Sequence, residues 1–171
     1  MRARLEAMAL EMPEVGDHPN RRGFRGRLTV ANAPSDRAPS GARGHRVMLT
    51  AKATEQALPS LLGMAVDYAP ELDRHDARLK VGIITSAEMR PLGGDGESVE
   101  VEGYLFAHDF PEVIAEMKRR RGELGMSYEI ADVRVVDAEA PVWVATEFTF
   151  TGAAMLLREK AAYQGTSVEL V

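Results

Sequence analysis

The sequence predicts an α+β protein, built on a small, mainly antiparallel β-barrel or sheet of about six strands and decorated by two or three helices. Three observations lead to this prediction. Segments rich in β-branched and alternating apolar residues recur along the chain, turn signals such as residues 93–96 (GGDG) separate them, and few segments have helical spacing. The length of 171 residues fits one domain, and 45% hydrophobic residues suffice for a core.

The chain divides into three parts. Residues 1–22 combine a short apolar-periodic piece with Pro13 and Pro19, which predicts a flexible leader. The regular patterns fall within residues 23–165, which we expect to form the main domain. Residues 166–171 carry no clear pattern, so we expect an irregular C-terminal end.

Six segments are predicted to be strands, because their residues are β-branched, aromatic or alternate in polarity. The turn at residues 93–96 should join the third and fourth of these strands into a hairpin. The predicted strands are residues 24–30, 45–50, 79–85, 98–106, 126–136 and 142–151.

Three segments are predicted to be helices. The first covers residues 54–62. The second begins at Asp109, which has Glu112 three residues later as in a capping box, and ends by Gly122. The third covers residues 153–162, which are rich in alanine, leucine and other strong helix formers.

The composition excludes several classes of protein and site. The chain has no cysteine, so disulfides, cysteine nucleophiles and thiolate metal sites are excluded. No apolar run approaches the roughly 20 residues that span a bilayer, and the first residues lack the apolar centre of a signal peptide. We therefore expect a soluble, intracellular protein that does not bind membranes.

The net charge of −5 is distributed unevenly. Residues 1–46 carry nine arginines and five acidic residues, whereas residues 47–171 carry twelve basic and twenty-one acidic residues. The acidic main body argues against a nucleic-acid-binding domain. The basic arm is either a solvated leader or a segment that contacts an anionic partner.

Ser127 is the candidate nucleophile. It lies two residues after Gly125, at the predicted junction of a helix and a strand, where the backbone can turn sharply. In its strand it should face away from Met126 and Tyr128 and share a face with Glu129. The alternative is a serine that only caps the preceding loop.

His75 is the candidate general base. It stands between Asp73 and Asp76 just before a predicted buried strand, and nearby carboxylates favour the charged form of a histidine. The alternative is an exposed loop residue. A metal site at these three residues is a weaker hypothesis, because consecutive loop positions rarely converge and the chain has no HExxH spacing. We therefore expect no metal and no cofactor.

Glu147 is the candidate third member of the site. It shares the polar face of a predicted strand with Trp143 and Thr149, and a carboxylate in such a strand needs a partner, which a histidine would supply. The alternative is an ordinary glutamate at the rim of the sheet. His108, just before the predicted helix at Asp109, is a second candidate for the third role.

The order of these motifs resembles the prohead (capsid maturation) serine proteases of tailed bacteriophages. The resemblance covers roughly residues 23–155, and many members of that family have Ser-x-Gly-Phe where this chain has Ser127, Tyr128 and Glu129. The matching motifs are residues 72–76 (LDRHD), 80–85 (KVGIIT), 124–129 (LGMSYE) and 147–154 (EFTFTGAA).

The resemblance implies a serine endopeptidase with a barrel-like fold related to that of the herpesvirus assembly proteases. His75 would match the base of the family, Ser127 its nucleophile and Glu147 the residue that orients the histidine. The herpesvirus enzymes use a second histidine as the third member, which keeps His108 as an alternative. Glu129, two residues after Ser127, would compete with Glu147 for the histidine.

The resemblance also implies the substrates and the place of action. The family cuts the scaffolding protein, the N-terminal segment of the major capsid protein and itself, inside the immature capsid in the host cytoplasm. The basic arm of this chain would then be the region of self-cleavage. The protein could also form a homo-oligomer. Two alternatives are an inactive capsid-assembly or scaffolding protein on the same fold, and a generic β-barrel binding module.

Overall fold

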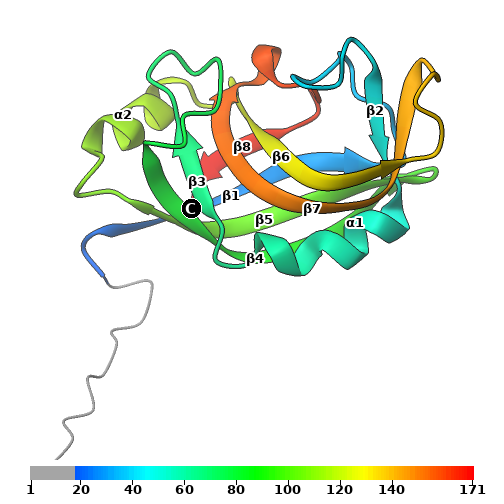
Figure 1. Cartoon of the computed structure of the whole chain (residues 1–171). Helices are drawn as coiled ribbons and strands as arrows, with labels where there is room; N and C mark the ends of the chain where they lie inside the picture. Colours follow the sequence, from blue (N-terminus) through cyan, green and yellow to red (C-terminus); the bar gives the residue numbers. More distant parts are fainter. Residues whose placement is uncertain (1–17) are drawn as a thin grey trace, which may run out of the picture.

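The computed structural model describes residues 18–171 and has an α+β fold dominated by strands (Figure 1). The sequence predicted about six strands, and this number is wrong, because the described residues form eight. They are β1 (Arg21–Ala31), β2 (Arg46–Leu49), β3 (Ala65–Tyr68), β4 (Lys80–Gly93), β5 (Gly96–Phe106), β6 (Leu124–Val135), β7 (Val142–Leu157) and β8 (Ser167–Leu170).

The predicted leader at residues 1–22 lies outside the described residues as far as position 17. Its last two residues already belong to β1, which pairs with β5 from Arg21 onwards. The self-cleavage expected in the basic arm likewise falls partly on residues that the structure does not describe.

Two α-helices accompany the strands of the described region: α1 (Ala51–Ala57) and α2 (Pro111–Arg119). The Thr50 side chain caps α1 by accepting a hydrogen bond from the Ala53 amide at 3.3 Å. The capping box predicted at Asp109 does not form. Phe110 is the N-cap of α2 instead, and the Asp109 carboxylate accepts a hydrogen bond from Nδ2 of the Asn20 side chain at 2.7 Å.

The helix predicted at residues 153–162 is wrong. β7 continues through this region to Leu157, and only a short 3₁₀ helix follows it at Arg158–Lys160. Positions 152–156 of β7 are all buried, because other parts of the chain cover both faces of the strand there. A strand buried on both faces does not alternate in polarity, so its small apolar residues look like a helix in the sequence.

The C-terminal end is also more regular than the sequence predicted. Residues Ser167–Leu170 form β8, which pairs antiparallel with β1 from Phe24 to Arg27. Val168 is buried in the main core, so β8 is an integral edge of the sheet.

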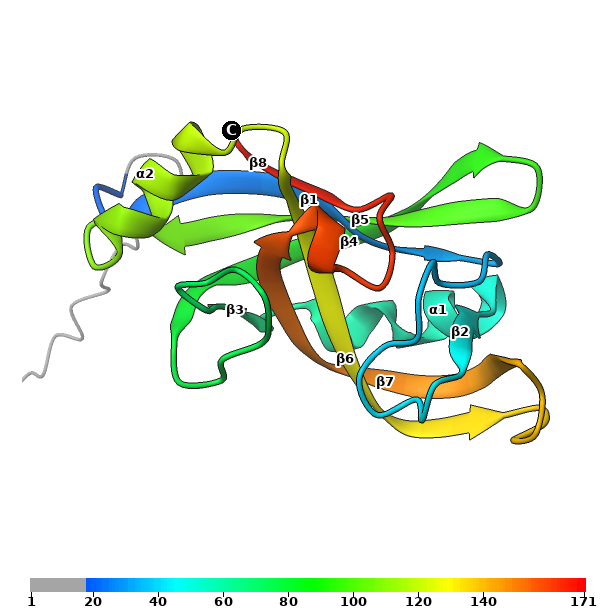
Figure 2. The same cartoon turned by 90° about the horizontal axis from the view of Figure 1, so that it is seen from above.

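The strands form one strongly curled sheet, a half-barrel, in the order β2-β7-β3-β4-β5-β1-β8. The long strand β7 is central: β6 pairs antiparallel with one of its edges, whereas β2 and β3 pair parallel with successive parts of the other. Seen from above, β6 and β7 cross over the layer formed by β1, β4 and β5 (Figure 2). The predicted hairpin of β4 and β5 is confirmed.

The core fills the inside of the curl. Its largest buried side chains come from strands on both sides of the curl and include Phe24, Leu28, Ile84, Met126 and Phe150. Gly26 allows β1 to approach β6 closely, since a Cβ there would lie 2.8 Å from the Met126 sulfur. The inner face of the sheet is therefore closely packed, and a site made of polar side chains must lie on the outer face or at the rims of the sheet.

Candidate active site

Three neighbouring strands bring Asp67, Ala154 and Ser127 into one row. Asp67 of β3 pairs with Ala154 of β7, and Ser127 of β6 pairs with the same alanine from the other side. Residues paired directly across a sheet point to the same face, and two strand spacings separate the outer members by about 10 Å. Their neighbours Val66, Met126 and others face the core, so this row lies on the opposite face.

His75 comes from the loop between β3 and β4 and lies next to this row. Its Nδ1 lies 3.3 Å from Oδ2 of Asp67 and 3.6 Å from Oε1 of Glu129. The Asp67 carboxylate therefore accepts the Nδ1–H, which leaves Nε2 as the acceptor nitrogen of the neutral ring. Nε2 is buried and has no hydrogen-bond partner among the described residues, so Ser127 is not hydrogen-bonded to it.

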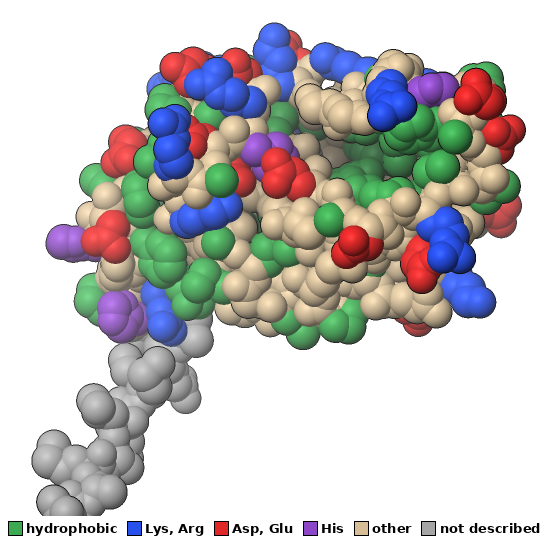
Figure 3. Space-filling view, in the orientation of Figure 1, with side chains coloured by type: hydrophobic (Ala, Val, Ile, Leu, Met, Phe, Trp, Pro, Cys, Tyr) green, Lys and Arg blue, Asp and Glu red, His purple; other side chains and the backbone are tan. Residues whose placement is uncertain are grey.

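His75 and Ser127 line the same pocket, which has a volume of about 310 Å³. This face of the molecule is visibly hollowed in the space-filling view (Figure 3). The walls carry both signs of charge. The lining comes from the segment 37–40, from Asp73, Arg74 and His75, from Ser127, Tyr128 and Glu129, and from Leu156, Lys160 and Ala162.

Asp67 is the buried anion of the site, with a side chain only 2% exposed. Its Oδ1 accepts a hydrogen bond from the Asp76 amide at 3.1 Å, and its Oδ2 lies 3.5 Å from the Lys80 ammonium as well as near His75. A buried carboxylate is tolerated when such partners compensate for lost hydration. The arrangement therefore holds a negative charge directly behind Nδ1 of His75.

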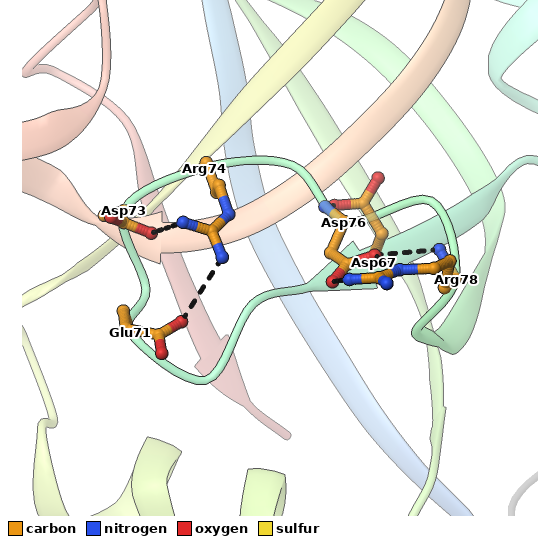
Figure 4. A network of polar contacts seen from close by, with 6 residues as sticks. All are labelled: Asp67, Glu71, Asp73, Arg74, Asp76 and Arg78. Atoms are coloured by element: carbon orange, nitrogen blue, oxygen red, sulfur yellow. Dashed lines mark hydrogen bonds and ion pairs between the residues drawn. The ribbon is translucent and has the colours of Figure 1, made fainter.

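The loop that carries His75 is held by ion pairs of its own (Figure 4). Asp76 accepts two hydrogen bonds from the Arg78 side chain, at 2.9 and 2.8 Å, and these hold the pKa of Asp76 at about 2. Arg74 lies 3.8 Å from Glu71 on the exposed side. Asp76 thus remains an anion at neutral pH and fixes the loop through Arg78 and through its own backbone contact to Asp67.

The opposite wall of the pocket is tied to the C-terminal segment. The amides of Asp36 and Arg37 donate to the Ala162 carbonyl at 2.9 and 3.3 Å. The Tyr163 hydroxyl donates to the Val47 carbonyl at 2.7 Å, and burial raises the pKa of Tyr163 to about 12. The segment 37–40 is therefore positioned by defined contacts on its side of Ser127.

The structure does not bring Glu147 to the histidine. Glu147 is 64% exposed and forms an ion pair with Arg134 of β6 at 3.1 Å. It precedes Ala154 by seven positions in β7, which corresponds to about 23 Å along a strand. Asp67 lies next to Nδ1 of His75, where Glu147 was expected, and Glu129 also lies near this nitrogen.

His108 also lies away from the pocket. Its side chain is 84% exposed, and its nearest acidic partner is Asp109, 4.0 Å away. Asp67 was not among the site residues expected from the sequence, because its neighbours in the sequence give it no partner. The one signal in the sequence is a single carboxylate between Val66 and Tyr68, which indicates a partnered acid but does not identify its partner.

Gly125 has a different role from the one that the sequence suggested. It lies inside β6 and not in a turn, and a Cβ there would lie 2.5 Å from Oγ1 of Thr166. The glycine therefore lets the C-terminal segment approach β6 two residues before Ser127. The hydroxyl of Thr166 also accepts a hydrogen bond from the Met126 amide at 3.2 Å.

Comparison with family models, curated proteins and solved structures finds no match to this chain. Within residues 18–171 no cluster of three or more histidine and acidic side chains is arranged to hold a metal ion. No helix of the described chain has both the length and the apolar character needed to cross a membrane.

Proposed function

We propose that this protein is a serine endopeptidase in which Ser127 is the nucleophile, His75 the general base and Asp67 the residue that orients the histidine. One observation carries the proposal. A buried carboxylate contacts Nδ1 of His75, whose other nitrogen has no partner among residues 18–171 and whose ring lines one pocket with Ser127. A nucleophile, a base and an orienting acid of this kind are the parts of a serine hydrolase.

The reaction would proceed in two halves. Ser127 Oγ attacks the peptide carbonyl carbon while His75 Nε2 takes its proton, and backbone amides beside the pocket stabilise the oxyanion. The imidazolium then gives this proton to the leaving amine as the peptide bond breaks. Water attacks the acyl-enzyme, again with His75 as base, and restores the Ser127 hydroxyl.

Asp67 suits the orienting role better than Glu147. Its charge is buried and lies 3.3 Å from Nδ1, so it stabilises the imidazolium that forms during the reaction. Glu129 lies slightly farther from Nδ1, at 3.6 Å, and is 55% exposed, so solvent screens its contribution more strongly. We assign Glu129 a supporting role at the rim of the pocket.

The biological role we propose is processing during phage prohead maturation. Its basis is the resemblance of the motifs around His75 and Ser127 to prohead proteases, and a small, mainly antiparallel curled sheet is compatible with an assemblin-like fold. The substrates would be the scaffolding protein, the major capsid protein and the protease itself, inside the immature capsid in the host cytoplasm.

Co-expression with the capsid and scaffolding proteins of the same genome tests this proposal. Intact masses should show fragments with the wild-type chain and none with Ser127→Ala or His75→Ala. A His108→Ala variant should cut normally and serves as a matched histidine control. Identical, uncut masses with the wild type and with Ser127→Ala would contradict the proteolytic role.

An inactive capsid-assembly or scaffolding protein on the same fold is the second candidate. The observation that favours it is the absence of a hydrogen bond between His75 Nε2 and Ser127 in the described structure. Such bonds are often long in free enzymes and tighten only with substrate, so the protease remains the better explanation. Capsid assembly that depends on the chain but not on the Ser127 hydroxyl would identify this alternative.

A further inference from the structure

A second, apolar pocket adjoins the candidate active site. It has a volume of about 220 Å³, several times the roughly 30 Å³ that one water molecule occupies in the liquid. It shares three lining residues with the pocket of His75 and Ser127, namely Pro39, Ser40 and Tyr128. The remaining lining is Gly41, Ala42, Val47, Ile130, Val133 and Trp143.

The two pockets differ in charge. Charged residues line the first pocket, among them Arg37, Arg74, Lys160, Asp73 and Glu129. Of the residues that the structure describes, none that lines the second pocket is charged. A ligand carboxylate or ammonium in the second pocket would lose hydration without gaining a partner, but a large apolar side chain would bury its surface there. The second pocket therefore favours apolar groups.

The indole of Trp143 is fixed before any ligand arrives. Its Nε1 donates to the Ala138 carbonyl at 2.9 Å, and its ring stacks on that of His45 with centroids 4.6 Å apart. His45 Nδ1 in turn lies 2.8 Å from the Ala140 carbonyl. A wall held in this way loses little conformational freedom on binding, which makes it suitable for selecting a side chain.

β6 runs between the pockets and offers a backbone edge. Ser127 stands at one pocket and Ile130 at the other, three residues or about 10 Å apart along the strand. In the described part of the chain β6 pairs only with β7, so its second edge has no strand partner. The Thr166 hydroxyl accepts from the Met126 amide at this edge, so a peptide could pair with β6 only from Ser127 onwards. Extended peptides bind such edges through main-chain hydrogen bonds and place alternate side chains in pockets.

We propose that this second pocket, the β6 apolar pocket, is a substrate subsite that selects a large apolar side chain about three residues from the scissile bond. This inference rests on the proposed function, because it takes Ser127 as the position of the scissile carbonyl. The occupant is a segment of the substrate polypeptide in extended conformation. Val133, which is 43% exposed at the pocket, contributes to the selection.

Binding is measured on the full chain carrying Ser127→Ala, so that no cleavage occurs. Trp143 is the only tryptophan of the protein, so selectively excited tryptophan fluorescence reports on this pocket. The probes are acetylated alanine hexapeptides in which a single leucine occupies each position in turn, with aspartate in its place as the matched control. Leucine peptides should give a saturable change, with affinity at least about tenfold above the aspartate peptides.

A pair of valine variants localises the binding. Val133→Asp should weaken the binding of the best leucine peptide by about 10- to 100-fold. Val136→Asp should leave it within about twofold, because Val136 is 70% exposed and does not line the pocket. Equal melting temperatures of the two variants would confirm that both fold.

The outcomes separate this inference from the proposed function. Leucine-selective binding that is lost in Val133→Asp, without cleavage by the wild type, would show an apolar peptide-binding pocket but contradict the protease, and with it the role of this pocket as a substrate subsite. Cleavage by the wild type without apolar preference near the cut would keep the protease and contradict the subsite. Equal binding of leucine and aspartate peptides, no saturable change, or unchanged binding in Val133→Asp would each overturn the inference.

Discussion

Asp67→Asn is the substitution that most sharply probes the proposed site. In the wild type, Asp67 Oδ1 accepts from the Asp76 amide at 3.1 Å, and Oδ2 lies 3.3 Å from His75 Nδ1 and 3.5 Å from Lys80 Nζ. Asparagine preserves the volume but offers one oxygen and one NH₂ group in place of two acceptors. The effect therefore depends on which way the new amide points.

The surroundings decide this orientation. If the NH₂ group faced the Asp76 amide, two donors would oppose each other in a buried place, which is unfavourable. The oxygen should therefore face the Asp76 amide, and the NH₂ group should face His75 Nδ1. The Lys80 ammonium, which is also a donor, can turn to solvent instead, because its side chain is 41% exposed. Nδ1 must then accept a hydrogen bond, so the proton of the neutral ring moves to Nε2. In that tautomer His75 cannot take the proton of Ser127.

The expected loss is large. The same substitution in Ser-His-Asp proteases lowers kcat by about 10⁴-fold through the wrong tautomer, which corresponds to about 5 kcal/mol at 1.36 kcal/mol for each factor of ten. The assay is the second-order rate constant for labelling by a fluorophosphonate, which requires an activated serine. We expect Asp67→Asn to label at least about 10³-fold more slowly than the wild type.

A matched carboxylate serves as the control. Glu147→Gln removes only an exposed ion pair with Arg134, worth at most about 1 kcal/mol of stability, and should label within about twofold of the wild type. Melting curves of both variants confirm that each is folded. Labelling of Asp67→Asn within tenfold of the wild type, or a larger loss in Glu147→Gln, would refute the assignment of the orienting acid.

Two further predictions concern stability. Gly103→Ala should lower the free energy of unfolding by about 3 kcal/mol, because its Cβ would clash with the Ile83 carbonyl oxygen of the paired strand. As a control, Gly96→Ala in the same strand meets only ordinary contacts, so it should change the free energy of unfolding by about 0.5 kcal/mol or less. Urea unfolding measures both values. Tyr163→Phe should cost about 1 kcal/mol at neutral pH, because it loses the hydrogen bond to the Val47 carbonyl. The raised pKa of Tyr163 means that its contribution is complete below pH 10 and is lost as pH rises towards 12, so the wild type should lose its advantage over Tyr163→Phe in that range. A constant difference between these two proteins from pH 8 to pH 11 would contradict the role of tyrosine burial.

Local signals in the sequence were sufficient for part of the fold. Residues 93–96 predicted the β4–β5 hairpin, because turn chemistry and alternation act over short distances. The helix predicted at residues 153–162 failed, since burial on both faces of β7 removes the alternation that identifies a strand. β8 was missed because four residues are too few to show a pattern before their partner β1 is known.

The residues of the candidate site were likewise only partly predictable from the sequence. Ser127 and His75 could be proposed from their residue types and neighbours, and both line one pocket. Asp67 could not be assigned, because its position follows from the parallel pairing of β3 with Ala154 of β7, eighty-seven positions later in the chain. The apolar pocket likewise combines Val47 of β2 with Val133 and Trp143 of the β6–β7 hairpin, which lies far from β2 in the sequence, so no local pattern connects them.

The most direct test of the central claim is to locate the fluorophosphonate adduct in the purified full-length protein by peptide mapping. The proposed site predicts one adduct, on Ser127, and labelling at least about 10³-fold slower in His75→Ala. No adduct on Ser127, or labelling of His75→Ala at the wild-type rate, would contradict the assignment of this site to a serine endopeptidase.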